Sequence, residues 1–348
     1  MVLTMRTDNP LVSVVMPVYM ADDFLLGSID SILNQTYENL ELLIICTDPT
    51  SKTIEILDVY ARSDERIKID YNQEEGLIES LNRGCRSARG RYIVRMDADD
   101  ISCTDRIEKQ VTFMEEHPDI GFSGSLMEVI DRSGKFVRMR NYPVSPLVIK
   151  WTLMYANCLA HPTIIMRRDI AKLLGFYRKE ALYVEDYDLW VRASAVSHLS
   201  NIPEVLVKYR FHENNCSRVH ELEKRDNEVI VSCSAIQKAW CDTIDEDLFC
   251  AFKKWKIDRS LSLGQIDILE HFIEDSALKL VRDNCLSDFE RSELGLSKAK
   301  IIMELARCSY GVSLRKASSL VFYAIKTHPE ILPQLLQFIR LYNRWYRT

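Results

Sequence analysis

A strongly apolar run of the chain ends in three carboxylates. It reads Tyr92-Ile93-Val94-Arg95-Met96-Asp97-Ala98-Asp99-Asp100. A buried strand cannot keep unpaired charges, so these acids must lie where the strand leaves the core, at the carboxyl edge of a sheet. That edge is where open α/β sheets bind their ligands. The segment therefore predicts an α/β sheet with a binding site at the end of this strand.

Two of these acids have the spacing of a metal site. Asp97 and Asp99 are two positions apart, so in an extended backbone their side chains project to the same side. Hard oxygen ligands of this kind suit Mn²⁺ or Mg²⁺, which keep other coordination positions open for phosphate oxygens. The alternative is a solvated turn or a helix cap, because carboxylates are common in turns. The neighbouring segments decide between these interpretations.

Strand-like and helix-like runs alternate through the first half of the chain. Apolar, β-branched runs occupy residues 12–19, 40–46, 67–69 and 120–124, and runs with helical period occupy residues 25–33, 53–61 and 77–88. Asp22 or Asp23 can cap the first helix, and Asp105 with Glu108 resembles a capping box for a helix through Glu116. The alternation implies a mostly parallel sheet with right-handed crossovers.

Composition and missing motifs exclude several classes of protein. The chain has 348 residues, and its net charge of −6 argues against a nucleic-acid-binding protein. Ten cysteines occur without a C-x-x-C pair, which argues against a zinc site. No signal peptide or membrane-spanning run is evident, so we expect a cytoplasmic protein. Neither G-x-G-x-x-G after the first strand nor a phosphate-binding P-loop is present, so a metal on the acids would have to bind any phosphate.

Six motifs in order resemble those of glycosyltransferase family 2. They are Val14-Val15-Met16-Pro17-Val18-Tyr19, Gly76-Leu77-x-x-x-Leu81-Asn82-x-Gly84, Met96-Asp97-Ala98-Asp99-Asp100, Asn157-x-x-x-His161-Pro162-Thr163, Glu185-Asp186-Tyr187-Asp188-Leu189-Trp190-x-Arg192 and Tyr209-Arg210-x-His212. The resemblance implies a GT-A fold, which is a Rossmann-like mixed α/β sheet flanked by helices, over a domain of residues 1–220. Residues 221–348 lie outside it, and their helical period predicts an all-α C-terminal domain.

The resemblance implies roles for several donor-side residues. Asp99 would be a direct metal ligand, and Asp97 would contact the ribose or a metal-bound water. Arg210 would meet the diphosphate, since a planar donor fork suits phosphate. His212 would complete the metal site or touch a phosphate when a loop closes, or else be an ordinary surface histidine.

The nucleoside contacts are also implied by the resemblance. Pro17 and Tyr19 would line the nucleobase, with Tyr19 stacking on it or acting as a lid over the sheet edge. The family commonly has two adjacent acids after the second strand, but this chain reads Cys46-Thr47-Asp48-Pro49. Asp48 would bond the base if the strand is one residue longer than usual, and Thr47 could otherwise offer a neutral hydrogen bond. A UDP-sugar is the expected donor.

The acceptor side is expected near a helix that begins around residue 185. Asp186 matches the position of the family's catalytic base, although acids at a helix start can simply be caps. Asn157, His161 and Glu185 would line the sugar or acceptor pocket, with a packing role as the alternative for His161. Asp188 is expected to pair with Arg192, one turn later.

These features predict an inverting, metal-dependent glycosyltransferase of cell-surface or capsular polysaccharide synthesis. Its partners would be a nucleotide-sugar donor and a saccharide or lipid-linked saccharide acceptor. Its rivals are a sugar-phosphate nucleotidyltransferase and a non-catalytic nucleotide-sugar-binding module. A final helix after Pro333 carries Arg340, Arg344 and Arg347 beside an apolar face, which suits peripheral contact at the inner face of a membrane or docking on its own domain.

Overall fold

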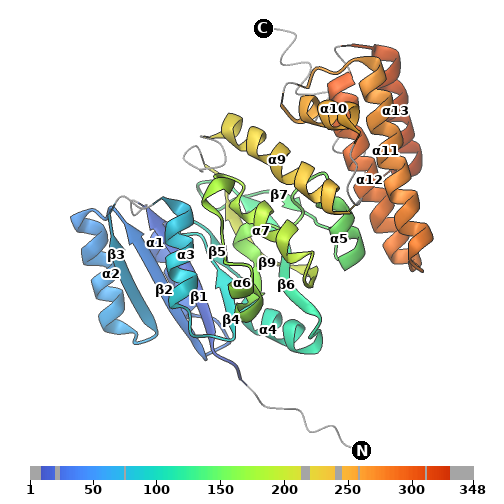
Figure 1. Cartoon of the computed structure of the whole chain (residues 1–348). Coiled ribbons are helices and arrows are strands. Elements are labelled where there is room, and N and C mark those ends of the chain that lie inside the picture. Colours follow the sequence, from blue (N-terminus) through green and yellow to red (C-terminus); the bar gives the residue numbers. More distant parts are fainter. Residues whose placement is uncertain are drawn as a thin grey trace, which may run out of the picture. The chain divides into compact units, whose positions relative to one another are not determined.

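The computed structural model describes residues 9–19, 24–73, 76–212, 220–239, 245–257, 259–309 and 312–329. They fall into two units (Figure 1). The first comprises the described residues within Met1–Val144 and Cys158–Glu221, and the second comprises those within Ser145–Asn157 and Leu222–Thr348. Asp22, Asp23 and the predicted helix after Pro333 lie outside the described residues.

The first unit is built on a mixed nine-stranded sheet. Its order is β3-β2-β1-β4-β8-β6-β9-β5, and β7 pairs with β6. The strands are β1 Val12–Tyr19, β2 Leu40–Thr47, β3 Ile67–Asn72, β4 Tyr92–Arg95, β5 Ile101–Ser102, β6 Ile120–Ile130, β7 Phe136–Arg140, β8 Ile165–Arg167 and β9 His198–Arg210. The first four strands of this order are parallel, whereas β8 runs antiparallel to both β4 and β6. The predicted mixed sheet of the GT-A type is confirmed.

Helices cover both faces of the parallel half of the sheet. The helices of this unit are α1 Leu25–Leu33, α2 Ser51–Ser63, α3 Leu77–Ser87, α4 Arg106–Glu116, α6 Arg168–Leu173 and α7 Glu185–Ala193, with short 3₁₀ turns η1 His161–Thr163 and η2 Lys179–Ala181. Alternate strand residues such as Val14 and Leu42 pack with Ile29 of α1 and Ile107 of α4. Because strand side chains alternate in direction, the residues between them face the other side, where α3 lies across β1 and β2 (Figure 1).

A glycine lets α3 approach the sheet closely. A Cβ atom at Gly84 would lie 2.4 Å from Cγ1 of Val15 and 3.2 Å from Cγ1 of Ile45. Both neighbours are β-branched and have little rotamer freedom, so they cannot move aside cheaply. The glycine of the third-helix motif is therefore explained by packing.

The capping box predicted for α4 is wrong. Asp105 is the N-cap residue but makes no side-chain capping bond. Its carboxylate instead pairs with Lys109 at 2.8 Å, and Oε2 of Glu108 accepts a 2.6 Å hydrogen bond from Thr36. Glu108 thus ties α4 to the loop after α1, a tertiary contact that local spacing could not reveal.

The second unit is all helical, as predicted for the C-terminal region. Its helices are α5 Pro146–Thr152, α9 Glu221–Ala239, α10 Glu246–Ile257, α11 Leu263–Asp283, α12 Asp288–Ser309 and α13 Leu314–Thr327. Helix α5 belongs to it because Trp151 Nε1 donates to Ser276 Oγ at 2.9 Å, and Tyr155 Oη lies 2.7 Å from the same atom. None of the helices in the described residues is long and apolar enough to cross a membrane.

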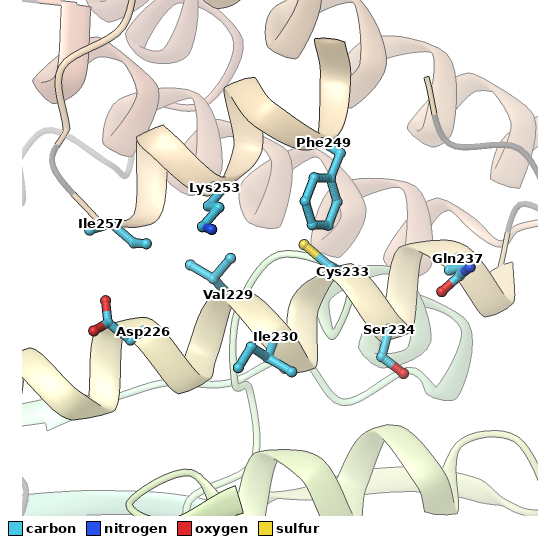
Figure 2. Close-up of a pocket in the computed structure, with 9 residues that line it drawn as sticks. All are labelled: Asp226, Val229, Ile230, Cys233, Ser234, Gln237, Phe249, Lys253 and Ile257. Carbon is cyan, nitrogen blue, oxygen red and sulfur yellow. The ribbon is translucent and has the colours of Figure 1, made fainter. Parts of the chain in front are cut away.

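An open groove runs between α9 and α10 (Figure 2). Its volume is about 560 Å³, and its walls include Val229, Ile230, Cys233 and Phe249. Lys253 and Asp226 are its charged lining residues. None of the site residues predicted from the sequence is among the residues that line this groove.

We expect Gly84→Ala to lower the free energy of unfolding by about 1–3 kcal/mol, because the added methyl group overpacks α3 against Val15. Gly27→Ala is the matched control, since a Cβ at that exposed position of α1 meets nothing within 4 Å. It should raise stability by about 0.5–1 kcal/mol through helix propensity. Urea unfolding measures both values. Equal stability of the two variants would contradict the close approach.

Candidate active site

The carboxyl ends of the parallel strands meet at one edge of the sheet. Tyr19 at the end of β1 lies opposite Thr47, and Thr47 lies opposite Asn72. Strand β4 ends earlier, with Arg95 opposite Val15. The chain then passes through the acids into β5, which pairs with the last part of β9. This pairing brings the end of β9, far along the sequence, back to the acids.

Three carboxylates cluster directly after β4. Ligand oxygens of Asp97, Asp99 and Asp100 all lie within 4.8 Å of one another. Asp97 and Asp99 are half-buried, and Asp100 is fully buried. Oδ1 of Asp100 accepts a 2.8 Å hydrogen bond from the backbone N–H of Arg210, while Oδ2 has no hydrogen-bond partner among the described residues.

Cationic and aromatic side chains surround this cluster. Arg95 forms an ion pair with Asp97. Nε2 of His212 lies 2.9 Å from Oδ2 of Asp99, and Nε of Arg210 donates to the backbone oxygen of Asp99 at 2.9 Å. The Arg210 guanidinium also lies 4.3 Å from the ring centre of Phe24. The residues predicted for the donor side, Asp97, Asp99, Arg210 and His212, are therefore together.

The electrostatics of the cluster favour a bound cation. Burial, and then the charge of Asp97, raise the pKa of Asp99 and raise that of Asp100 well above its usual range. Grouped carboxylates repel one another unless a positive charge lies between them. Together with the buried, unpartnered Oδ2 of Asp100, the all-oxygen donor set fits a hard divalent ion such as Mg²⁺ or Mn²⁺.

A buried arginine holds the strand end in place. Arg106 on α4 donates from Nη2 to the backbone oxygen of Arg95 at 2.9 Å and from Nε to Oε1 of Gln110 at 3.1 Å. Gln110 in turn donates to the backbone oxygen of Thr163 in η1 at 2.6 Å. Burial lowers the pKa of Arg106 to about 9. This network fixes the backbone just before the acids.

The expected nucleoside residues lie at the ends of β1 and β2. Tyr19 is 64% exposed, Pro17 is half-buried, and Asp48 is exposed with φ of 48°. The Thr47 hydroxyl is buried, donates to Oδ1 of Asn72 at 2.7 Å and lies 2.9 Å from Oγ of Ser80. Thr47 therefore ends β2 with its hydroxyl engaged inside the unit, and Asp48 follows it at the surface.

Helix α7 carries the acids predicted for the acceptor side. Asp186 is half-buried, and its Oδ1 accepts a 2.7 Å hydrogen bond from the backbone N–H of Tyr187. The predicted Asp188–Arg192 pair is confirmed at 2.7 Å. Arg192 also donates to the backbone oxygens of Leu174 and Phe176, so it anchors α7 to the loop before it.

His161 and Glu185 lie in one buried cluster. Nε2 of His161 is 2.9 Å from the hydroxyl of Tyr177, and its Nδ1 is 3.9 Å from Oε1 of Glu185. Burial, and then the charge of Arg95, lower the pKa of His161 well below its usual range, so the ring is neutral. Asn157 is half-buried and packs with the helical unit.

Tyr177 connects the two groups of acids. Burial raises its pKa well above the usual range, and the charges of Glu185 and Asp186 act in the same direction, whereas that of Arg95 opposes them. Arg95, which pairs with Asp97, and the acids of α7 therefore all shift the pKa of the Tyr177 hydroxyl. Asn82 clamps the backbone of this tyrosine, donating to its carbonyl at 2.9 Å and accepting from its N–H at 3.0 Å.

Several residues that support the site received no role from the sequence, among them Asp100, Arg95 and Asn82. Asp100 had no assigned role although it stands in the acidic run, and Arg95 was counted as part of an apolar strand. Asn82 was quoted in a motif without a role. A charged residue inside a buried strand and a polar residue inside an apolar helix face were the available signals.

The chain is similar in sequence to known glycosyltransferases. The family model for glycosyl transferase family 2 matches residues 13–175. An uncharacterized glycosyltransferase of Haemophilus influenzae is 38% identical over 229 residues, covering 62% of this chain and 70% of the relative. The O-antigen biosynthesis glycosyltransferase WbnJ of Escherichia coli is 35% identical over 214 residues, covering 60% and 82%. The crystal structure of S. aureus TarS with UDP aligns with TM-score 0.48 and 16% identity, covering 91% of this chain and 87% of that chain.

We expect His161→Gln to weaken the acid sensitivity of folding. The histidine has a lowered pKa in the folded chain and an ordinary value of about 6.5 when unfolded, so the unfolded chain binds more protons below that pH. Its contribution to the free energy of unfolding therefore shrinks as pH falls from 7 to 5. Urea titrations in EDTA should show a smaller loss for the variant than for the wild type. Identical losses would contradict a neutral, buried ring.

Proposed function

The chain belongs to glycosyltransferase family 2, and on that premise we propose that the acid-rich edge of its sheet transfers a sugar from a nucleoside diphosphate to an acceptor hydroxyl with inversion. The observation that carries this proposal is the cluster of Asp97, Asp99 and Asp100 beside Arg210 and His212. The similarity to an O-antigen biosynthesis enzyme supports a role in cell-surface or capsular polysaccharide synthesis.

On the donor side, Asp99, Asp97 and His212 would hold Mn²⁺ or Mg²⁺. When bound, such an ion neutralises the charge that grows on the leaving diphosphate. Arg210 would contact the diphosphate while its backbone N–H and its Nε keep Asp100 and Asp99 in place. Arg95 would orient Asp97 for a contact with the ribose.

The nucleoside would lie across the ends of β1 and β2. The exposed ring of Tyr19 offers a stacking surface, and Pro17 lines the same strand end. Asp48 would accept a hydrogen bond from the base, which suits the ring N–H of uracil, so a UDP-sugar is the proposed donor. Asp48 follows β2 directly and has a left-handed backbone, with φ of 48°.

On the acceptor side, Asp186 would remove the proton from the attacking hydroxyl. Displacement at the anomeric carbon from the face opposite the diphosphate inverts its configuration. The neutral ring of His161 would orient a sugar by a hydrogen bond, with Glu185 beside it in the pocket. The charges of Arg95 and Asp186 both act on the pKa of Tyr177, which supports a site shared by the donor and acceptor residues.

Family membership favours transfer over the two alternatives. A nucleotidyltransferase would form pyrophosphate from a sugar phosphate and a nucleoside triphosphate, and a binding module would bind nucleotide without turnover. We further propose a cytoplasmic location at the inner face of the membrane, with contact through the helix predicted after Pro333.

We expect Asp99→Ala to lower turnover by about 100-fold or more, because the leaving diphosphate loses its charge neutralisation. The assay is nucleotide release from a panel of nucleotide sugars with Mn²⁺. Wild-type activity should vanish in EDTA and return with Mn²⁺, and Mn²⁺ affinity by calorimetry should fall in the variant. Unchanged turnover in Asp99→Ala would end the metal assignment.

We expect Asp186→Asn to reduce transfer by about 100- to 10,000-fold, as loss of a general base does, with unchanged nucleotide affinity. Asp169→Asn is the matched control, because Oδ1 of Asp169 accepts the next backbone N–H at 2.8 Å just as Oδ1 of Asp186 does at 2.7 Å. The control should keep full transfer. Full transfer in Asp186→Asn would remove the base.

A further inference from the structure

Strand β7 carries two arginines that form no ion pair with an acid among the described residues. Arg138 and Arg140 are exposed and two positions apart, so their side chains leave the strand on the same face. In the part of the chain that the structure describes, no ion pair includes either residue, and partial burial and the charge of Arg140 lower the pKa of Arg138. Two positive charges therefore lie close together without a counter-charge from the described chain.

The pairing of the strands places these arginines beside a buried floor. Arg138 lies opposite Val129 of β6, which in turn lies opposite Tyr209 of β9. Arg140 lies opposite Met127. Paired residues share a face of the sheet, and both Val129 and Met127 are buried. The two arginines thus form the rim of a buried apolar part of the sheet. The pairing of β7 with β6 fixes the positions of their backbone.

The charges of the rim and of the proposed base act on one tyrosine. Tyr142 lies two residues after Arg140, whose positive charge lowers its pKa. Burial raises the pKa of Tyr142, and the negative charge of Asp186 raises it further. Tyr142 therefore lies within electrostatic reach of both the arginine and the proposed base.

The turn before β7 is fixed to the acid cluster. Nη1 of Arg210 lies 3.4 Å from the backbone oxygen of Asp131 and 3.2 Å from that of Arg132, while Nε of Arg210 donates to the backbone oxygen of Asp99. One guanidinium thus joins the β6–β7 turn to the donor side. A group bound at β7 would therefore have a fixed position relative to the proposed metal site.

We infer that Arg138 and Arg140 form a subsite for a phosphate or diphosphate group of the acceptor, whose hydroxyl is directed to Asp186. Guanidinium groups match phosphate oxygens with planar pairs of donors. This inference rests on the proposed function, because it takes Asp186 as the base. Phe136 is exposed and lies two positions before Arg138, on the same face of the strand, where it offers apolar contact to an alkyl chain and favours a lipid-linked acceptor.

The test is calorimetric titration of the full chain with inorganic pyrophosphate in EDTA, so that no metal-held diphosphate contributes. We expect Arg138→Gln with Arg140→Gln to weaken binding at least about tenfold, and the double Lys variant to keep most of it. The control removes two exposed arginines that have acid partners, Arg86→Gln with Arg91→Gln, and should bind as the wild type does. Decyl phosphate compared with inorganic phosphate shows whether an alkyl chain adds affinity.

The outcomes separate this inference from the proposed function. Donor hydrolysis by water should stay within about twofold of wild type in the Gln pair, because the donor side is untouched. Pyrophosphate binding that is absent, or equally weakened in the control pair, would overturn the subsite, whatever the enzyme transfers. Two other results would also overturn it. If the Gln pair loses binding to phosphatidylglycerol vesicles but keeps its binding to pyrophosphate, β7 is a membrane contact. If the Gln pair behaves as the wild type in every assay, the arginines are charges that protect an edge strand.

Discussion

Mutual repulsion among three carboxylates at the end of one strand is the constraint on which this structure depends. Asp97, Asp99 and Asp100 have ligand oxygens within 4.8 Å of one another, and two of the three have raised pKa values. Such a cluster persists only if the surrounding chain supplies opposing charge and donors. Each acid has its own support: the side chain of Arg95, the ring of His212 and the backbone N–H of Arg210.

The order of the strands in the sheet brings these supporting groups to the acids. Two of the three supporting residues stand at the end of β9, and the short pairing of β5 with β9 places them there directly after the acidic turn. Arg106 and Gln110 support the backbone that leads into this turn. Arg106 donates to the backbone oxygen of Arg95, and Gln110 donates to the backbone oxygen of Thr163. The residues proposed for the acceptor side are supported in a similar way, because Asn82 and Arg192 bond to the backbone of the loop that carries Tyr177. The functional side chains thus rest on bonds from distant parts of the chain.

The alternation of strands and helices could be predicted because hydrophobic period is a local property. The acids, His161 and the motif of α7 could be found because residue type and order carry them. The failure of the capping box could not be predicted from the local spacing of Asp105 and Glu108. Asp105 pairs with Lys109 instead, and Glu108 accepts a hydrogen bond from the distant Thr36. The assignment of α5 to the helical unit was equally hidden, because it depends on bonds from Trp151 and Tyr155 to Ser276. Long-range hydrogen bonds decided the points on which pattern and structure differ.

A crystal structure of the full chain soaked with UDP and Mn²⁺ tests the central claim most directly. Anomalous scattering locates the manganese without reference to any assumed ligand. The account predicts one strong peak in contact with Asp99 and with the diphosphate, and a uracil ring between Tyr19 and Asp48. Manganese bound elsewhere, or UDP bound without contact to the acids after β4, would contradict it.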